Sequence, residues 1–324
     1  MATPYSRYIF GRIPWYGFLI VVGICIAIII SEKESRRIHL PDETIIDLAL
    51  ILLPSGIIGA RLYYVFFSWE NYRDNPIKIL YIWEGGLAIY GGLLFGILSI
   101  LIYCRIKRIS ILTILDILSP GVILAQAIGR WGNYFNQEAY GIQIFNSDFQ
   151  FFPLAVLITQ NGSAEWHMAT FFYESILNSI VFIFLIWGRR NLFRQKGDLF
   201  YFYLYFYGSI RTFVEGLRTD SLILDQGIRI SQLLSIIISL IILTFFTIKR
   251  YEFNKKSKFT ILILWLFYSV LTFLILHFLN RIANLQQSVR QYLSIMLPYL
   301  LIQNAILPII YGFSQKEDVF YAFH

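Results

Sequence analysis

Charged residues are scarce in this sequence. They make up 15% of the 324 residues, whereas soluble domains contain about a quarter. Hydrophobic residues make up 57%, which is more than a water-soluble chain of this length hides in its core. These proportions exclude an ordinary soluble domain and predict an integral membrane protein.

Cysteine is also rare, since the chain contains only Cys25 and Cys104. The two lie far apart in the sequence, and neither belongs to a CxxC pair or has a histidine beside it. Such an arrangement excludes a disulfide framework and a zinc site of the usual spacing. We predict two packed thiols, no metal site and no cofactor.

Lysine and arginine are missing altogether from residues 131–170, although the formal net charge of the chain is +7. The basic residues gather instead in short loops between apolar runs. That pattern sets the orientation of a membrane protein, and a nucleic-acid site would need a basic stripe or patch. We therefore expect no nucleic-acid partner.

Apolar runs divide the chain into candidate transmembrane helices, each of which needs about 20 apolar residues to cross a bilayer. The predicted spans are 14–30, 44–67, 84–104, 111–130, 170–187, 198–216, 228–248, 259–279 and 291–313. The predicted fold is an all-α polytopic membrane helical bundle. It has a seven-span core in residues 1–250 and two extra spans in a C-terminal extension, residues 251–324.

The connecting segments differ in their content of lysine and arginine. Those after the first, third, fifth and seventh predicted spans are rich in basic residues, and the alternate segments are poor in them. Because basic loops stay in the cytoplasm, the N-terminus is predicted to lie outside and the C-terminus inside. The long segment 131–170 is then external and is expected to rest at the membrane interface.

Polar residues inside the predicted spans converge on one leaflet in this topology. Arg61, Arg130 and Arg211 all fall in the outer parts of their spans. An arginine at the bilayer centre costs about 2.5–3.5 kcal/mol on insertion scales, so each needs a polar cavity, a partner or the interface. Snorkelling anchors or structural ion pairs would explain any one of them, whereas three at one depth favour a binding site.

Two segments give further detail of that leaflet. Arg211, Glu215 and Arg218 follow one another at helical spacing, so they share a face and Arg211 can pair with Glu215. In the second segment, residues 129–141, an arginine, two asparagines, a glutamine and a glutamate stand among glycines at the end of a span. This density of amides beside apolar helix indicates a pocket for a polar headgroup. Tyr90-Gly91-Gly92 in the third span is a weak indication of a site, because close packing of two helices through small residues would explain this run too.

The sequence from Gly129 to Gly141 resembles the signature of the phosphatidylglycerol–prolipoprotein diacylglyceryl transferases. The family pattern reads Gly-Arg-x-Gly-Asn-Phe-x-Asn-x-Glu-x-x-Gly, and it is met here with Tyr134 in the Phe position. Further landmarks occur in family order. They are Trp15-Tyr16-Gly17, Gly59-Ala60-Arg61-Leu62-Tyr63-Tyr64, Tyr207-Gly208 with Arg211 and Glu215, and Ser231-Gln232-Leu233-Leu234-Ser235. The resemblance covers about residues 10–250.

The resemblance implies a bacterial inner-membrane enzyme that begins lipoprotein maturation. It would move a diacylglyceryl group from phosphatidylglycerol to the lipobox cysteine of a prolipoprotein signal peptide. The implied catalytic residues are Arg130, Arg211, Glu215 and Tyr90. The implied substrate-binding residues are Tyr16, Arg61, Asn133, Asn136, Glu138 and Gly141.

The sequence departs from the family at Tyr90, where the usual residue is a histidine that is a candidate catalytic base. This leaves the general base open, and His167 in the external segment is a weaker candidate. Two other functions stay open as well. One is a non-catalytic lipid-binding homologue, and the other is a transporter of small anions, which would need polar residues in the inner halves of the spans too.

Overall fold

The computed structural model describes residues 6–160, 162–219, 229–251, 296–309 and 311, together with four single positions, 263, 266, 268 and 270. The chain divides into two compact units. The first unit comprises residues 1–23, 123–193 and 201–324, and the second comprises residues 24–122 and 194–200. This division differs from the predicted boundary at residue 250, and that boundary stays a prediction.

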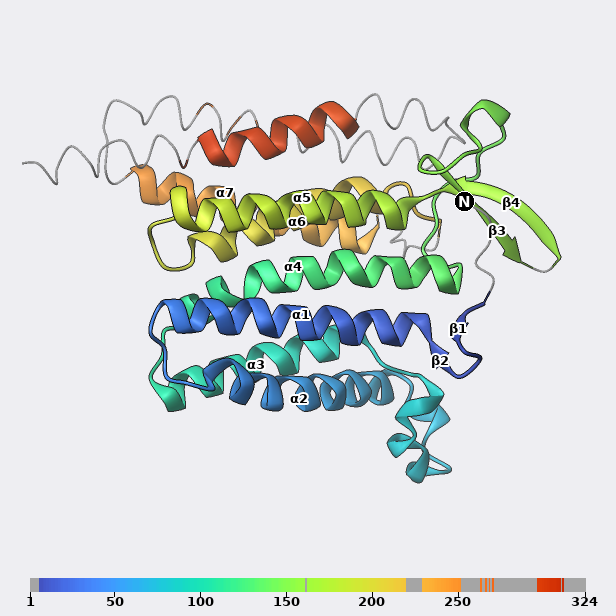
Figure 1. The fold of residues 1–324 in the computed structure, drawn as a ribbon, viewed down its shortest axis with the longest axis horizontal. Coiled ribbons are helices and arrows are strands. Elements are labelled where there is room, and N and C mark those ends of the chain that lie inside the picture. Colours follow the sequence, from blue (N-terminus) through green and yellow to red (C-terminus); the bar gives the residue numbers. More distant parts are fainter. Residues whose placement is uncertain are drawn as a thin grey trace, which may run out of the picture. The chain divides into compact units, whose positions relative to one another are not determined.

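Seven helices occupy the positions of the first seven predicted spans (Figure 1). They are α1 (Trp15–Arg37), α2 (Thr44–Phe67), α3 (Ile89–Lys107), α4 (Ile111–Asn136), α5 (Thr170–Asn191), α6 (Asp198–Glu215) and α7 (Ile230–Tyr251). Helices α1 to α5 are long and apolar enough to cross a membrane, so the chain is a multi-pass membrane protein. The total of seven spans plus two stays a prediction. The eighth predicted span lies mostly outside the described residues.

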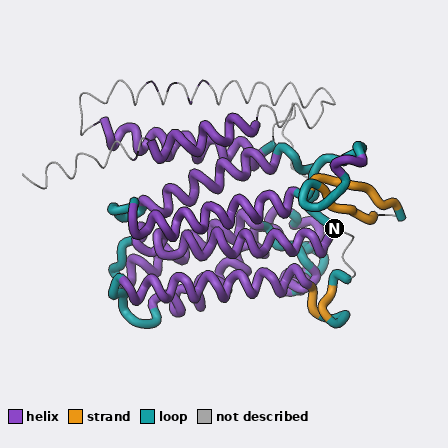
Figure 2. The backbone as a smooth tube through the Cα atoms, turned by 45° about the horizontal axis from the view of Figure 1, so that its top comes forward, coloured by secondary structure: helices purple, strands orange, loops and turns teal. Residues whose placement is uncertain are grey.

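Short strands and 3-10 turns connect the helices. The strands are β1 (Tyr8–Ile9), β2 (Ile13–Pro14), β3 (Ala155–Gln160) and β4 (Ser163–Met168), and the turns are η1 (Trp69–Asn71), η2 (Pro76–Leu80), η3 (Ile82–Glu84) and η4 (Ser147–Phe149). β1 pairs with β2, and β3 with β4, both antiparallel. Figure 2 shows both ribbons of the first unit beyond the ends of its helices. The all-α prediction is therefore right for the bundle but omitted these ribbons.

In the second unit, helices α2 and α3 lie side by side and touch through glycines (Figure 1). A Cβ atom added at Gly91 would lie 2.2 Å from the carbonyl oxygen of Gly59, and one added at Gly59 would lie 2.6 Å from that of Gly91. Small residues allow such close approach, which membrane helices use in place of a hydrophobic driving force. The alternative interpretation of Tyr90-Gly91-Gly92 as a packing motif is thus confirmed for Gly91.

We expect Gly91→Leu to separate α2 from α3 and to lower the thermal unfolding temperature of the purified protein markedly. The added side chain would collide with the Gly59 backbone, and overpacking of this kind costs about 1–3 kcal/mol and occasionally more. The matched control is Gly96→Leu on the same helix, where an added Cβ would only contact Leu52 at an ordinary 3.8 Å. Equal unfolding temperatures for the two variants would contradict this packing.

The first unit is built on the C-terminal half of α4 together with α5, α6 and α7. The Ser175 hydroxyl of α5 donates to the Ala127 carbonyl oxygen of α4 at 2.9 Å, and Gln126 of α4 donates to the Tyr203 hydroxyl of α6 at 3.1 Å. Aromatic rings of α5 and α6 fill the space between them, for example Phe184 against Phe206 at 5.2 Å. These contacts hold three helices at fixed positions around the polar residues described below.

Residues 296–309, inside the ninth predicted span, also pack on this unit. The Tyr205 hydroxyl donates to the Gln303 carbonyl oxygen at 2.7 Å, and the Gln303 amide donates to the Ser239 hydroxyl at 3.3 Å. All three residues are buried. The described part of the C-terminal extension is therefore joined to α6 and α7 by buried hydrogen bonds.

Candidate active site

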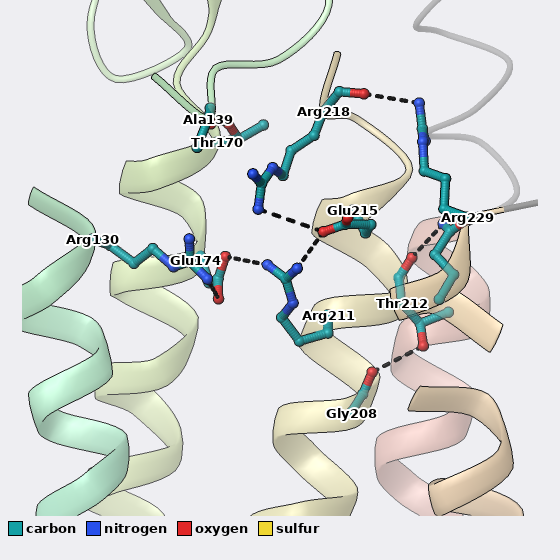
Figure 3. Close-up of polar contacts among 11 residues, drawn as sticks. Arg130, Ala139, Thr170, Glu174, Gly208, Arg211, Thr212, Glu215, Arg218 and Arg229 are labelled. Carbon is teal, nitrogen blue, oxygen red and sulfur yellow. Dashed lines mark hydrogen bonds and ion pairs between the residues drawn. The ribbon is translucent and has the colours of Figure 1, made fainter. Parts of the chain in front are cut away.

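A chain of five charged side chains lies where α4 and α6 end and α5 begins (Figure 3). Glu174 bridges two of its arginines. One carboxylate oxygen, Oε1, lies 2.7 Å from Nη2 of Arg130, and the other, Oε2, lies 3.2 Å from Nη1 of Arg211. Arg211 also pairs with Glu215, whose Oε2 lies 3.6 Å from Nη1 of Arg218. We call these five residues the ion-pair cluster.

The ion-pair cluster is held away from solvent. The Glu174 side chain is 1% exposed, that of Arg211 13% and that of Arg130 20%. Burying charges is costly unless they pair, so the alternation of guanidinium and carboxylate groups is what allows the cluster to exist here. Three arginines face two glutamates, so the five side chains carry a net charge of +1. This excess of positive charge favours the binding of an anion.

The structure therefore brings together the predicted residues Arg130, Arg211 and Glu215. It adds Glu174, which the sequence analysis missed. Glu174 is the only carboxylate in α5, which carries no other charged residue until its basic end. The signal was available, because an ionisable residue within a membrane span marks a functional site by default.

Two amide side chains of residues 129–141, the segment that carries the family signature, donate to Glu138. Asn133 donates from Nδ2 to Glu138 Oε1 at 3.0 Å, and Asn136 donates to the same oxygen at 3.3 Å. Gln137 and Ala139 adopt left-handed backbone conformations, with φ of 53° and 55°, which turn the chain sharply after α4. Glu138, just beyond α4, thus fixes two asparagines in the last turns of that helix.

Tyr16 and Gly141 border this segment. The Tyr16 ring packs on Gly132, where an added Cβ would lie 2.5 Å from Tyr16 Cδ2. An added Cβ at Gly141 would lie 2.7 Å from Met168 Cβ and 3.0 Å from the Leu217 carbonyl oxygen. Only glycine fits at either position, so Gly132 lets the end of α4 approach α1, and Gly141 lets the segment after α4 approach the end of α6.

Arg61 belongs to the second unit and serves the loop between α2 and α3. It is 5% exposed. Its guanidinium donates to five backbone carbonyl oxygens, at 2.6 to 3.3 Å, from Lys78, Ile79, Tyr81, Gly85 and Gly86. A guanidinium has five N–H donors, so these bonds occupy its full donor capacity. The hydrogen bonds explain the burial of Arg61 without any ligand, and substrate binding by it stays a prediction.

Tyr90 lies in the first turn of α3 in the second unit and is 43% exposed. His167 lies on β4 in the first unit. Its Nδ1 is 2.9 Å from the Gly141 carbonyl oxygen, and its ring contacts that of Tyr140 at 4.5 Å. His167 therefore has a packed position in the hairpin. The catalytic base stays a prediction for either residue.

The fold and the site together define a multi-pass membrane protein with a buried ion-pair cluster among its helices. Residues 7–248 match the family model described as prolipoprotein diacylglyceryl transferase. The chain belongs to that family.

Three relatives carry the name phosphatidylglycerol–prolipoprotein diacylglyceryl transferase. The protein from Enterococcus faecalis is 42% identical over 245 residues, which cover 75% of this chain and 88% of the relative. That from Streptococcus equi subsp. equi is 43% identical over 232 residues, covering 71% and 88%. That from Lactobacillus johnsonii is 41% identical over 233 residues, covering 70% and 83%.

Proposed function

We propose that this protein transfers the diacylglyceryl group of phosphatidylglycerol to the lipobox cysteine of prolipoprotein signal peptides, the first step of lipoprotein maturation. The observation that carries the proposal is the pair of arginines held on opposite oxygens of one buried glutamate, Glu174. Family membership and the names of the relatives supply the reaction class and the two substrates.

The reaction is a substitution at a saturated carbon. The cysteine thiol loses its proton, sulfur forms a bond to the glyceryl carbon, and the bond from that carbon to the phosphate oxygen breaks. The electron pair leaves with the oxygen, so glycerol phosphate departs. The phosphate changes from a diester with one negative charge to a monoester that develops a second.

Arg130 and Arg211 are the residues proposed to stabilise that charge. A guanidinium matches two phosphate oxygens with parallel hydrogen bonds, and preorganised donors act most strongly in a site from which water is excluded. Glu174 holds both arginines in place, and Glu215 fixes Arg211 from its other side. The net charge of +1 on the ion-pair cluster neutralises the bound diester and favours the more negative leaving group.

Residues 129–141, which carry the family signature, are proposed to bind the polar part of the substrates. Asn133 and Asn136 would offer amide groups, with Glu138 as their positioning residue. Tyr16 would border the headgroup, and Gly141 would give the segment its shape. Arg61 is proposed to act on substrate through the loop whose carbonyl groups it holds.

Tyr90, in the position where the family usually has histidine, is proposed to assist deprotonation of the thiol. The thiol has an ordinary pKa of about 8.5, so a small fraction is thiolate at neutral pH and a base or a positive field raises the rate. Replacing Tyr90 with phenylalanine separates these two sources. An unchanged rate would remove the hydroxyl from the chemistry.

We further propose that the protein resides in the bacterial inner membrane with its N-terminus outside and its C-terminus inside. The basic loops support this orientation, and they would place the ion-pair cluster in the outer leaflet, where signal peptides emerge. A reporter enzyme fused to the C-terminus, active only in the cytoplasm, measures the orientation. Activity of a reporter that works only outside would refute it.

The direct test is to incubate the purified protein with phosphatidylglycerol and a lipobox peptide and to measure the peptide mass. The expected product is a peptide heavier by one diacylglyceryl group, attached as a thioether to cysteine. A peptide with serine in place of that cysteine is the control and stays unmodified. Anion flux in vesicles without any adduct would instead favour the transporter.

A further inference from the structure

A second polar layer lies next to the ion-pair cluster, one helical turn farther from the ends of the helices. On α4, Gln126 precedes Arg130 by four residues, and on α5, Asn178 follows Glu174 by four. On α6, Tyr207 precedes Arg211 by four. Residues four apart share a helix face, so each helix presents a charged group at one level and a neutral polar group at the next.

This neutral layer is continuous with the ion-pair cluster. Gln126 donates from Nε2 to the Tyr203 hydroxyl at 3.1 Å, which joins α4 to α6 at the deeper level. The Tyr203 ring stacks on that of Tyr207 with their centroids 6.0 Å apart. Tyr207 in turn lies close enough to Glu174 and Arg211 to interact with their charges. We call Gln126, Asn178, Tyr203 and Tyr207 the neutral layer.

The burial of Asn178 is not accounted for by any hydrogen bond to the described residues of the bundle. Asn178 is 0% exposed, and among the described residues neither its Oδ1 nor its Nδ2 makes a hydrogen bond. Gln126 Oε1 is likewise buried without a hydrogen bond to any described residue. Nearby hydroxyls on α5 behave differently, since Ser175 and Ser179 both donate to helix carbonyl oxygens. Native proteins satisfy buried amides, so these atoms indicate a ligand or ordered water.

The chemistry of the unsatisfied atoms selects the ligand. An amide offers both donors and acceptors, and a hydroxyl group is the partner that can both donate and accept. The neutral layer carries no charge, and both carboxylates of the adjoining cluster are already paired with arginine. A cationic headgroup would therefore meet only arginines, whereas a neutral diol next to a phosphate would fit both levels.

We propose that the neutral layer, through Asn178, is the subsite that binds the hydroxyl groups of a glycerol headgroup while Arg130 and Arg211 bind its phosphate. This inference rests on the proposed function and names the feature by which the site selects its lipid. Asn178 binds the departing half of the lipid, and the diacylglyceryl group that is transferred lies elsewhere. Loss of Asn178 should thus change which headgroup is accepted without changing the product.

The experiment compares two donor lipids, phosphatidylglycerol and phosphatidylpropanol, which share acyl chains and phosphate. The second has a three-carbon headgroup without hydroxyls, and both yield the same peptide adduct. A site that hydrogen-bonds a hydroxyl rejects the analogue that lacks it, so the intact protein should prefer phosphatidylglycerol in kcat/KM by about 100-fold or more. In Asn178→Leu, transfer from phosphatidylglycerol should fall by a similar factor, and transfer from phosphatidylpropanol should not.

The matched control is Asn191→Leu, the same substitution at the exposed end of α5, where the amide donates to the Trp187 carbonyl oxygen. It should keep the full preference. Asn178→Leu should unfold at the same temperature as the intact protein or higher, because it removes a buried amide without partners. A loss of preference together with retained stability is a result that a purely structural asparagine would not give.

Two results would overturn the inference. One is an intact protein that uses both lipids equally, and the other is an Asn178→Leu variant that keeps the preference, which would assign buried water to the neutral layer. The rise in unfolding temperature that each lipid produces supplies the same comparison without chemistry. If no adduct forms from phosphatidylglycerol, the proposed function fails, and lipid-dependent stabilisation still decides whether Asn178 binds hydroxyl groups.

Discussion

Replacing Arg211 with lysine is expected to lower diacylglyceryl transfer by about 100- to 1,000-fold while the protein still folds. Lysine keeps the positive charge between Glu174 and Glu215 but loses the planar fork. It would contact one carboxylate at a time and could not hold two phosphate oxygens. The measurement is kcat/KM with phosphatidylglycerol and a lipobox peptide, together with the unfolding temperature.

Alanine at the same position should abolish transfer but also destabilise the bundle, because Glu174 and Glu215 each lose one of their two arginine partners. The lysine variant is therefore the cleaner test of chemistry. Arg36→Lys provides the control, since Arg36 pairs with Glu32 in the same i, i+4 spacing with its own side chain 70% exposed. It should retain full activity. Near-normal transfer by Arg211→Lys would refute a phosphate-binding fork at this position.

Replacing Glu174 with alanine is expected to destabilise the protein by about 3–5 kcal/mol, the largest effect of any single substitution in the cluster. Arg130 and Arg211 would be left in a buried site without the carboxylate that bridges them. Thermal unfolding in detergent measures the loss. Transfer should fall as well, because neither guanidinium would keep its orientation.

A second substitution distinguishes this explanation from simple loss of packing. Arg130→Met in the Glu174→Ala background removes the guanidinium whose ion pair is lost with Glu174, so it should recover part of the stability but none of the activity. Glu70→Ala is the control, because Glu70 pairs with Arg73 at the surface, where their side chains are 78% and 58% exposed. Independent, additive effects of the Glu174 and Arg130 substitutions would mean that the two side chains are not coupled.

The placement of helices could be predicted from the sequence because apolar runs and basic loops are local signals. Seven predicted spans coincide with α1 to α7, and the pairing of Arg211 with Glu215 followed from their spacing on one helix. The β3–β4 hairpin was missed although its signal was present. A run rich in β-branched residues, 155–160, precedes Asn161-Gly162, a pair typical of tight hairpin turns.

The partners of the buried polar groups could not be predicted in this way. Arg61 looked equivalent to Arg130 in the sequence, because both are arginines near the end of a span. In the structure, Arg61 donates to five backbone carbonyl oxygens, whereas Arg130 pairs with Glu174. Which partner a side chain meets depends on helices distant in sequence, and periodicity carries no information about that.

The sequence by itself thus determined that this protein is a membrane helical bundle with a transferase signature and arginines in its spans. Only the tertiary structure decided that Glu174 bridges two of those arginines and that Asn178 lies buried without a hydrogen bond to any described residue. The physical reason is that hydrophobic spacing fixes which segments become helices, whereas the pairing of buried charges and amides is set by how those helices pack.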